Sequence, residues 1–204
     1  SAASGPFNTY GAGLILTGGV LYVFLILAGL SCNLFAFEEG GMRSFILAPI
    51  ARRKILMGKN ITVVLLALIF SIALLIVNAI VFRDLTLPNI LFAALSFVCF
   101  AALMSLLGNW FSIRFSKRMQ YGKRLNVSGV AGLLLIPMIL LLSVGPLCAV
   151  IVGYLTSNLF YEYATLAGLA AVSAAMYFLL IGFQGRSLER RELEILEAVK
   201  EPDQ

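Results

Sequence analysis

Five long apolar segments, none with Lys, Arg, Asp or Glu inside it, constrain this chain more than any other feature. They cover roughly residues 11–36, 61–82, 90–111, 128–155 and 163–183. About 20 helical residues, at about 1.5 Å each, cross the roughly 30 Å of hydrocarbon in a bilayer. Because a chain in lipid must satisfy its own backbone hydrogen bonds, spanning segments of this kind are helices. The sequence therefore predicts an all-α, polytopic integral membrane bundle of five transmembrane helices, forming a single transmembrane domain over residues 1–204.

Composition excludes most other classes of protein. Hydrophobic residues make up 61% of the 204 residues and charged residues 12%, with a mean hydropathy of +0.99, which excludes a soluble globular domain. Histidine is absent, which removes the commonest general base and metal ligand. The three cysteines, Cys32, Cys99 and Cys148, are isolated in apolar runs and are expected in the core, not in a metal site or disulfide.

The sequence also lacks a phosphate-binding loop. Gly58-Lys59 is followed by Asn60, Gly122-Lys123 is followed by Arg124, and neither pair has the required glycine five residues earlier. Spanning segments without ionisable residues also lack the groups that proton relays use. Asn78, Ser105 and Asn109 are expected to be interhelical hydrogen-bonding groups. We expect no catalytic residue, metal, cofactor or nucleic-acid partner, so the chain is not predicted to be an enzyme.

The basic residues predict the topology, because Lys and Arg are retained on the cytoplasmic side of short loops. Of 15 Lys and Arg, five lie between the first and second segments, five after the third and four in the tail, which leaves only Arg83 in a short turn. Basic and non-basic loops therefore alternate. We place the N-terminus outside and the C-terminus in the cytoplasm.

Two further elements are predicted from residues that typically break, start or end helices. The fourth segment is longer than a crossing needs, and Gly145-Pro146 favours a break near 145–146, with residues 146–162 forming a short re-entrant or outer-surface element. The alternative is a single helix that is tilted and kinked. The tail, residues 184–204, is predicted to form a short amphipathic helix that starts near Ser187, with pairs Arg190–Glu194 and Glu197–Lys200 along a solvated or interfacial surface.

The loop at residues 37–60 alternates basic and apolar clusters. Met42, Phe45 and Ile46 have helical spacing, Pro49 suits the first turn of a second short helix, and Gly58 suits its end. These features predict one or two amphipathic helices at the membrane surface. Plain anchoring by positive charge is the simpler alternative.

The order of residues in this loop resembles the coupling-helix region of the permease subunits of ABC-2 type transporters. An acidic pair follows a membrane helix, and then come Arg43, Pro49, an arginine three residues later, an Ile-Leu pair and Gly58-Lys59. Such permeases have six crossings and a re-entrant outer element before the last, and our five would match the second to sixth. The departure is the first helix, which we expect to be missing because the chain lacks its natural start.

The resemblance implies a function and a set of partners. The chain would be the membrane permease subunit of an ATP-driven exporter in the bacterial cytoplasmic membrane. It would pair with a second permease copy or homologous half and with a separate cytoplasmic ABC ATPase. The implied ATPase-coupling contacts are Glu38, Glu39, Arg43, Pro49, Arg52 and Arg53, with Lys59 as an anchor at the membrane edge. The alternatives are a non-transporting membrane scaffold or assembly factor and, third, a lipid-modifying enzyme.

Overall fold

Every regular element of the computed structural model is an α-helix within the residues that it describes, which are 10–35, 44–45, 47, 49–82, 85–115 and 129–199. The helices are α2 (Ala12–Ser31), α4 (Arg52–Phe82), α5 (Leu87–Arg114), α6 (Gly129–Thr156) and α7 (Leu159–Val199). Each of the five is long and apolar enough to cross a membrane. The architecture is therefore consistent with a polytopic helical bundle.

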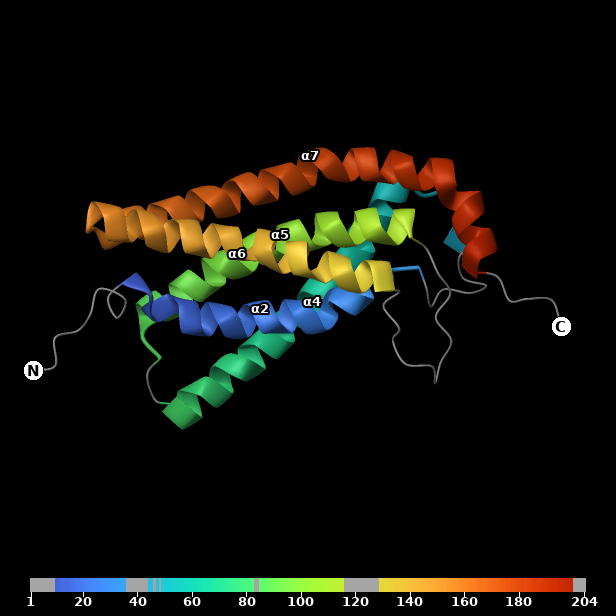
Figure 1. Ribbon diagram of the computed structural model, residues 1–204. Coiled ribbons are helices and arrows are strands. Elements are labelled where there is room, and N and C mark those ends of the chain that lie inside the picture. The colour runs from blue at the N-terminus through green and yellow to red at the C-terminus, as the bar shows by residue number, and fades with distance from the viewer. Residues whose placement is uncertain are drawn as a thin grey trace, which may run out of the picture.

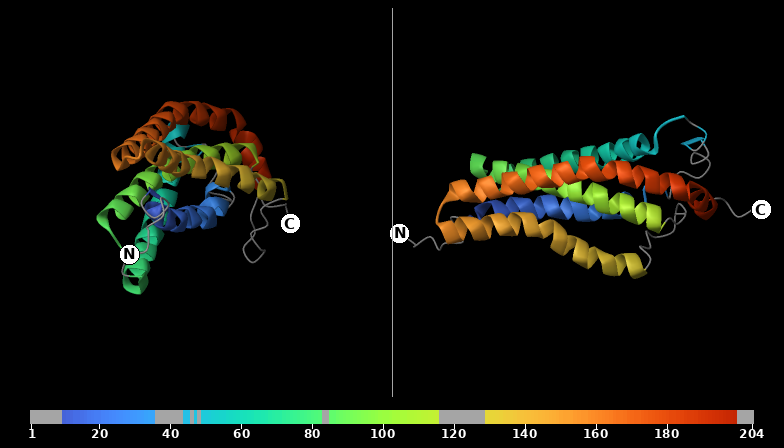
Figure 2. Two further views of the ribbon diagram at one scale, coloured as in Figure 1. Left: turned by 60° about the vertical axis from the view of Figure 1, so that its left-hand side comes forward. Right: turned by 90° about the horizontal axis from the view of Figure 1, so that it is seen from above.

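Helix α5 lies at the centre of the bundle. It packs most extensively against α7 on one side and α2 on the other, while α6 lies along α7 and α4 splays away from the bundle towards its C-terminal end (Figures 1 and 2). Aromatic rings join α2 to α5, since the ring of Phe24 lies 5.2 Å from that of Phe97 and 5.9 Å from that of Phe100. Phe24 and Phe100 are completely buried, so this cluster is the middle of the core.

The outer surface of the bundle is apolar. Ile15 on α2, Ile80 on α4 and Leu179 on α7 are 71–78% exposed. A surface of this kind needs lipid or a partner to cover it. Cys99 is buried as the sequence predicted, but Cys148 is exposed on α6, so its expected place in the core is wrong.

Helix α6 runs without interruption from Gly129 to Thr156 and contains both Pro137 and Pro146. The predicted break near 145–146 is therefore wrong, and so is a separate element at 146–162. A proline removes one backbone donor and bends a helix, but an apolar environment favours keeping every other backbone bond. The alternative of one kinked helix is what forms, and the ribbon of α6 visibly bends (Figure 2).

The connection between α6 and α7 is only two residues long. Ser157 has a left-handed backbone, with φ of 50°, and the Asn158 side-chain Oδ1 accepts a hydrogen bond from the Phe160 backbone N–H at 2.9 Å. Serine tolerates this conformation less readily than glycine, and the asparagine provides a side-chain cap for the new helix. The turn therefore starts α7 at once, where the sequence predicted a longer outer segment.

Helices α4 and α7 are longer than a membrane crossing. Their 31 and 41 residues correspond to about 46 and 62 Å, against roughly 30 Å of hydrocarbon. Gly58 lies inside α4, so the predicted helix end there is wrong. Residues 184–199 of the tail continue α7 and do not form a separate helix from Ser187, while 200–204, with Lys200 of the predicted pair Glu197–Lys200, lie outside the described residues. One glycine costs a helix only about 1 kcal/mol, which the surrounding residues offset.

The charged ends of these two helices meet at one end of the bundle (Figure 1), which we call the basic end. All eight Lys and Arg residues within the described ranges lie in the first turns of α4, at the end of α5 or in the last part of α7. The basic end is thus defined by Arg52, Arg53, Lys54, Lys59, Arg114, Arg186, Arg190 and Arg191. Which side of a membrane it faces stays a prediction from the charge pattern.

Candidate functional site

Arg52, the first residue of α4, joins three segments at the basic end. Its Nε donates to Glu192 Oε2 on α7 at 2.7 Å, and its Nη1 donates to the backbone carbonyls of Phe45 at 2.8 Å and Ile50 at 3.3 Å. The Arg52 and Glu192 side chains are only 15% and 19% exposed. A charge-assisted bond in such a place is stronger than a solvated surface pair. Arg52 therefore fixes the start of α4 against the last part of α7.

A glycine contact supports the same junction. A Cβ added to Gly185 of α7 would lie 2.8 Å from the backbone nitrogen of Arg53 and 3.0 Å from its Cα. Only a residue without a side chain permits the two backbones to approach so closely. The Arg53 side chain itself is exposed, as are Pro49 and Lys54.

Lys59 fixes α4 to the end of α2. Its Nζ donates to the Leu34 carbonyl at 2.7 Å and lies 5.1 Å from the Phe35 ring centroid and 5.5 Å from that of Phe45. A cation here satisfies a carbonyl just beyond the helix end and gains cation–π attraction from two rings. Lys59 thus ties α2, α4 and the segment before α4 together.

The seven sequence-predicted contact residues therefore fall into three groups. Arg52 and Lys59 make bonds within the chain, whereas Pro49 and Arg53 are exposed and open to a partner. Glu38, Glu39 and Arg43 lie outside the described residues. Of the predicted short helices, Ser44, Phe45 and Leu47 are helical, while residues 52–58 belong to α4.

Sequence reasoning missed Glu192 as the partner of Arg52. It paired Arg190 with Glu194, but Glu194 Oε2 accepts from Arg191 Nε at 2.8 Å. A signal was present in the tail, because Leu188 and Ile195 lie four residues before and three after Glu192 on the same helix face, and both are buried. An acid in an apolar stripe predicts an opposite charge on the neighbouring element. The tail is correspondingly packed against the bundle and is not merely a solvated cap.

Buried amides connect the helices next to this junction. Asn109 Nδ2 on α5 donates to Gln184 Oε1 on α7 at 2.8 Å, and Gln184 Nε2 donates to the Leu106 carbonyl at 2.8 Å. Asn60 Nδ2 on α4 donates to Tyr177 Oη on α7 at 3.1 Å. The predicted interhelical role of Asn109 is confirmed. Helix α7 is therefore hydrogen-bonded to α5 and, separately, to α4.

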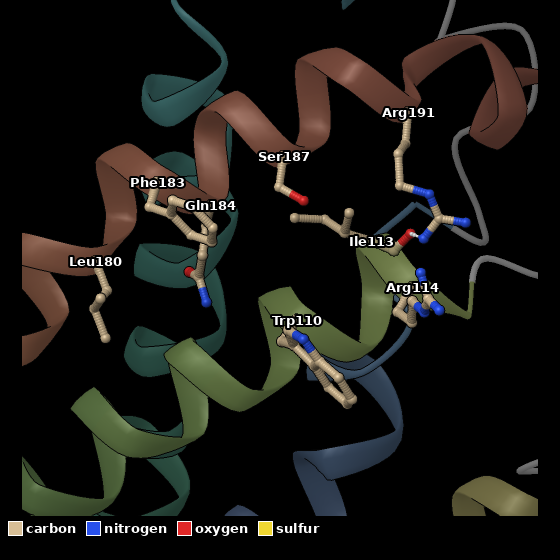
Figure 3. A pocket seen from close by; sticks show the side chains of 8 residues that line it. All are labelled: Trp110, Ile113, Arg114, Leu180, Phe183, Gln184, Ser187 and Arg191. Carbon is tan, nitrogen blue, oxygen red and sulfur yellow. Dashed lines mark hydrogen bonds between the residues drawn. The ribbon is translucent and has the colours of Figure 1, made fainter.

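A cavity of about 460 Å³ opens between α5 and α7 at the basic end (Figure 3). Arg191 crosses it, with its Nη1 donating to the Ile113 carbonyl at 2.9 Å near the end of α5. Arg114 lies beside Arg191, and Trp110, Phe183 and Leu180 line the apolar part (Figure 3). The cavity therefore has a cationic end and an apolar end.

An apolar groove of about 340 Å³ lies between α4, α5 and α7. Ile61, Val98 and Phe178 are among its lining residues, and its polar lining residues are Ser105 and the bonded pair Asn60 and Tyr177. Its walls are therefore suited to an apolar or amphiphilic molecule, not to an ion. Among the described residues, no group of three or more Cys, Asp and Glu lies together as a metal site would require.

Comparison with protein-family models, with curated proteins and with solved structures finds no match for this chain.

Proposed function

We propose that this chain is the membrane-spanning permease subunit of an ATP-driven exporter of the ABC-2 type, driven by a separate cytoplasmic ATPase. One observation carries the proposal. The exposed residues Pro49, Arg53 and Lys54 form a segment that includes the first turn of α4, a continuous 31-residue helix that extends through the bundle. A partner that displaces this segment acts on a rigid rod, because an α-helix transmits displacement along its axis with little bending.

The contacts at the basic end support a coupling role. Arg52 and Gly185 hold the start of α4 against α7, so displacement of the exposed segment moves both helices. The apolar groove is bounded by α4, α5 and α7, and a shift of α4 and α7 relative to α5 changes its width. In the proposed mechanism, ATPase closure moves this pair of helices, and an amphiphilic substrate passes between two permease copies.

The first test separates the exposed contacts from the structural ones. Because Arg52 forms a largely buried pair, reversing its charge perturbs packing as well as any partner contact. We would instead make the double variant Arg53→Glu/Lys54→Glu, with Arg186→Glu/Arg190→Glu as a control of equal charge change on exposed residues of α7. Each protein is purified from native membranes in mild detergent, and its stoichiometric partners are identified by mass spectrometry.

The proposal expects a P-loop ATPase in fixed ratio with the wild-type chain, lost with the α4 variant and retained with the α7 control. Gly185→Leu, compared with Gly182→Leu, tests transmission itself, since a Cβ at Gly182 meets nothing within 4 Å. Gly185→Leu should keep the ATPase bound but abolish ATP-dependent transport. If no ATPase accompanies the wild-type chain, the permease proposal fails and a membrane scaffold becomes the better account.

A further inference from the structure

We infer that the cavity between α5 and α7 at the basic end binds the phosphate of an anionic phospholipid from the adjoining leaflet, with its acyl chains lying along Leu180 and Phe183. This site is separate from the groove between α4, α5 and α7 and does not depend on the proposed transport function. It requires only that the bundle spans a bilayer.

The charge of the lining favours an anion. Among the described residues, the eight that line the cavity include two arginines, Arg114 and Arg191, and no carboxylate. Arg191 uses Nε for Glu194 and Nη1 for the Ile113 carbonyl, which fixes the guanidinium, and within the described ranges Nη2 is left as a donor. Arg114 is exposed, with its side chain on the same side of the cavity (Figure 3). A guanidinium fork is well matched to phosphate oxygens.

Glu194 is the acid nearest to this pair, since it is bonded to Arg191. Its side chain is 66% exposed and it does not line the cavity, so it neutralises only part of the positive charge. The Ser187 side chain points into the cavity between the cationic and apolar parts (Figure 3). A hydroxyl there suits a second phosphate oxygen or the glycerol of a headgroup.

The apolar part of the cavity favours a lipid over a soluble anion. Trp110 is 52% exposed and Phe183 64% exposed. Trp110 lies closer to the middle of the bilayer than Arg114 does along α5, and Phe183 lies closer to it than Arg191 does along α7. Trp110 precedes Arg114 by four residues, or about 6 Å along α5. Tryptophan is enriched at this depth, between headgroups and acyl chains. A phosphate at the arginines would therefore place its acyl chains against Trp110 and Phe183.

The same lining discriminates between headgroups. Phosphatidylcholine carries a quaternary ammonium beside its phosphate, and the lining offers no carboxylate to balance that ammonium within the part of the chain that the structure describes. Phosphatidylglycerol has the phosphate without the cation. Each basic residue near a membrane surface contributes enough attraction for about a fivefold preference for anionic lipid.

Trp110 is the only tryptophan of the chain and lines this cavity, so the tryptophan fluorescence reports on this position. The full chain is reconstituted in vesicles that contain increasing fractions of phosphatidylglycerol or phosphatidylcholine, each brominated near the headgroup end of its acyl chains. We expect brominated phosphatidylglycerol to quench Trp110 at a mole fraction at least about fivefold lower than brominated phosphatidylcholine. Equal quenching by the two lipids would overturn the inference.

Variants identify the residues responsible. Arg114→Gln should reduce the preference by about fivefold, whereas Arg190→Gln, on an exposed residue outside the lining, should leave it unchanged. Ser187→Asp places a carboxylate inside the cavity and should abolish the preference, which keeps the test valid if Arg114→Gln does not fold. If both cavity variants keep the wild-type preference for phosphatidylglycerol, the inference is contradicted. It is also contradicted if an equal concentration of inorganic phosphate displaces the lipid, because the cavity would then bind a soluble anion.

Discussion

The bond between Arg52 and Glu192 offers the sharpest test of how the basic end is held together. Glu192→Gln removes the carboxylate but keeps the side-chain shape, so the Arg52 guanidinium loses its charge-assisted bond to Glu192 Oε2. A hydrogen bond to a charged group contributes about 1.5–3 kcal/mol, and the low exposure of both side chains argues against the near-zero values of surface pairs. We expect Glu192→Gln to lower the free energy of unfolding by about 2 kcal/mol.

Arg52→Gln should lower the free energy of unfolding by more than Glu192→Gln does. It removes the same bond and also removes the two donations from Nη1 to the carbonyls of Phe45 and Ile50. Losing these two donations, the partly buried bond to Phe45 and the exposed bond to Ile50, raises the expected loss of unfolding free energy to about 3–4 kcal/mol. This asymmetry arises because Arg52 also donates to the Phe45 and Ile50 carbonyls, whereas Glu192 takes part only in the bond that both variants remove.

The assay is thermal unfolding in mild detergent at a fixed heating rate, followed by circular dichroism. For a chain of this size, each kcal/mol shifts the midpoint by about 2–4 °C, so the two single variants should melt about 4–8 °C and 6–16 °C lower. The double variant Arg52→Gln/Glu192→Gln completes the cycle, and its midpoint should lie close to that of Arg52→Gln. Arg53→Gln, on an exposed neighbour, is the control and should shift the midpoint by less than about 2 °C.

Charge reversal provides the refuting result. Arg52→Glu alone places two carboxylates together and should be the least stable variant, whereas Arg52→Glu/Glu192→Arg restores the pair but not the carbonyl bonds. The reversed pair should therefore recover part of the loss. If it melts no higher than Arg52→Glu, or if Arg53→Gln destabilises as much as Glu192→Gln, then the two side chains do not hold α4 against α7.

Two further predictions concern close packing and buried amides. Gly108→Ala places a Cβ against the Ser31 side chain and 2.7 Å from the Ser31 carbonyl oxygen, so it should destabilise the α2–α5 contact by about 1–3 kcal/mol. Gly168→Ala is the control, because a Cβ there meets nothing within 4 Å, and it should be neutral or slightly stabilising in the same melting assay. Gln184→Leu should lower the free energy of unfolding by about 1–2 kcal/mol, because it leaves the buried Asn109 amide without its Gln184 partner. Adding Asn109→Leu should recover much of that stability. A double variant less stable than Gln184→Leu would contradict this prediction.

The positions of the helices could be predicted from the sequence because they follow from apolar length alone. All five predicted segments overlap helices of the structure. The ends of α4 and α7 could not be predicted in this way, because apolar length reports where a chain meets lipid and not where its helix stops. Gly58 and Ser187 are read locally as helix boundaries, but in the structure both helices continue past them, and Arg52 and Glu192 beyond them pair across α4 and α7.

The candidate site could be predicted only in part. Charge and position indicated that residues 49–59 matter, but not that Arg52 and Lys59 turn inward while Arg53 stays exposed. Which side chains of α4 point inward depends on how α4 is rotated about its axis relative to α7, and α7 begins more than 100 residues after the start of α4. The sequence of one helix gives no information on the rotation of its neighbour. The glycine at 185, which permits the contact, carries no local signal that distinguishes it from Gly182.

The buried face of α7 shows how its two ends act together. Ile181, Leu188 and Ile195 are buried at seven-residue intervals, the repeat of helices that pack side by side along their length. The polar contacts follow the same face, with Tyr177 and Gln184 seven residues apart and Gly185 and Glu192 seven residues apart. Apolar packing gives little net attraction between helices in lipid, so close backbone contact and polar pairs must determine the register. On α7 these determinants continue from the apolar part of the bundle into the charged extension, and α4 meets them at Asn60, Arg53 and Arg52. A force applied at the exposed start of α4 therefore acts on one continuous seam, and the groove beside Asn60 and Tyr177 lies at the far end of that seam.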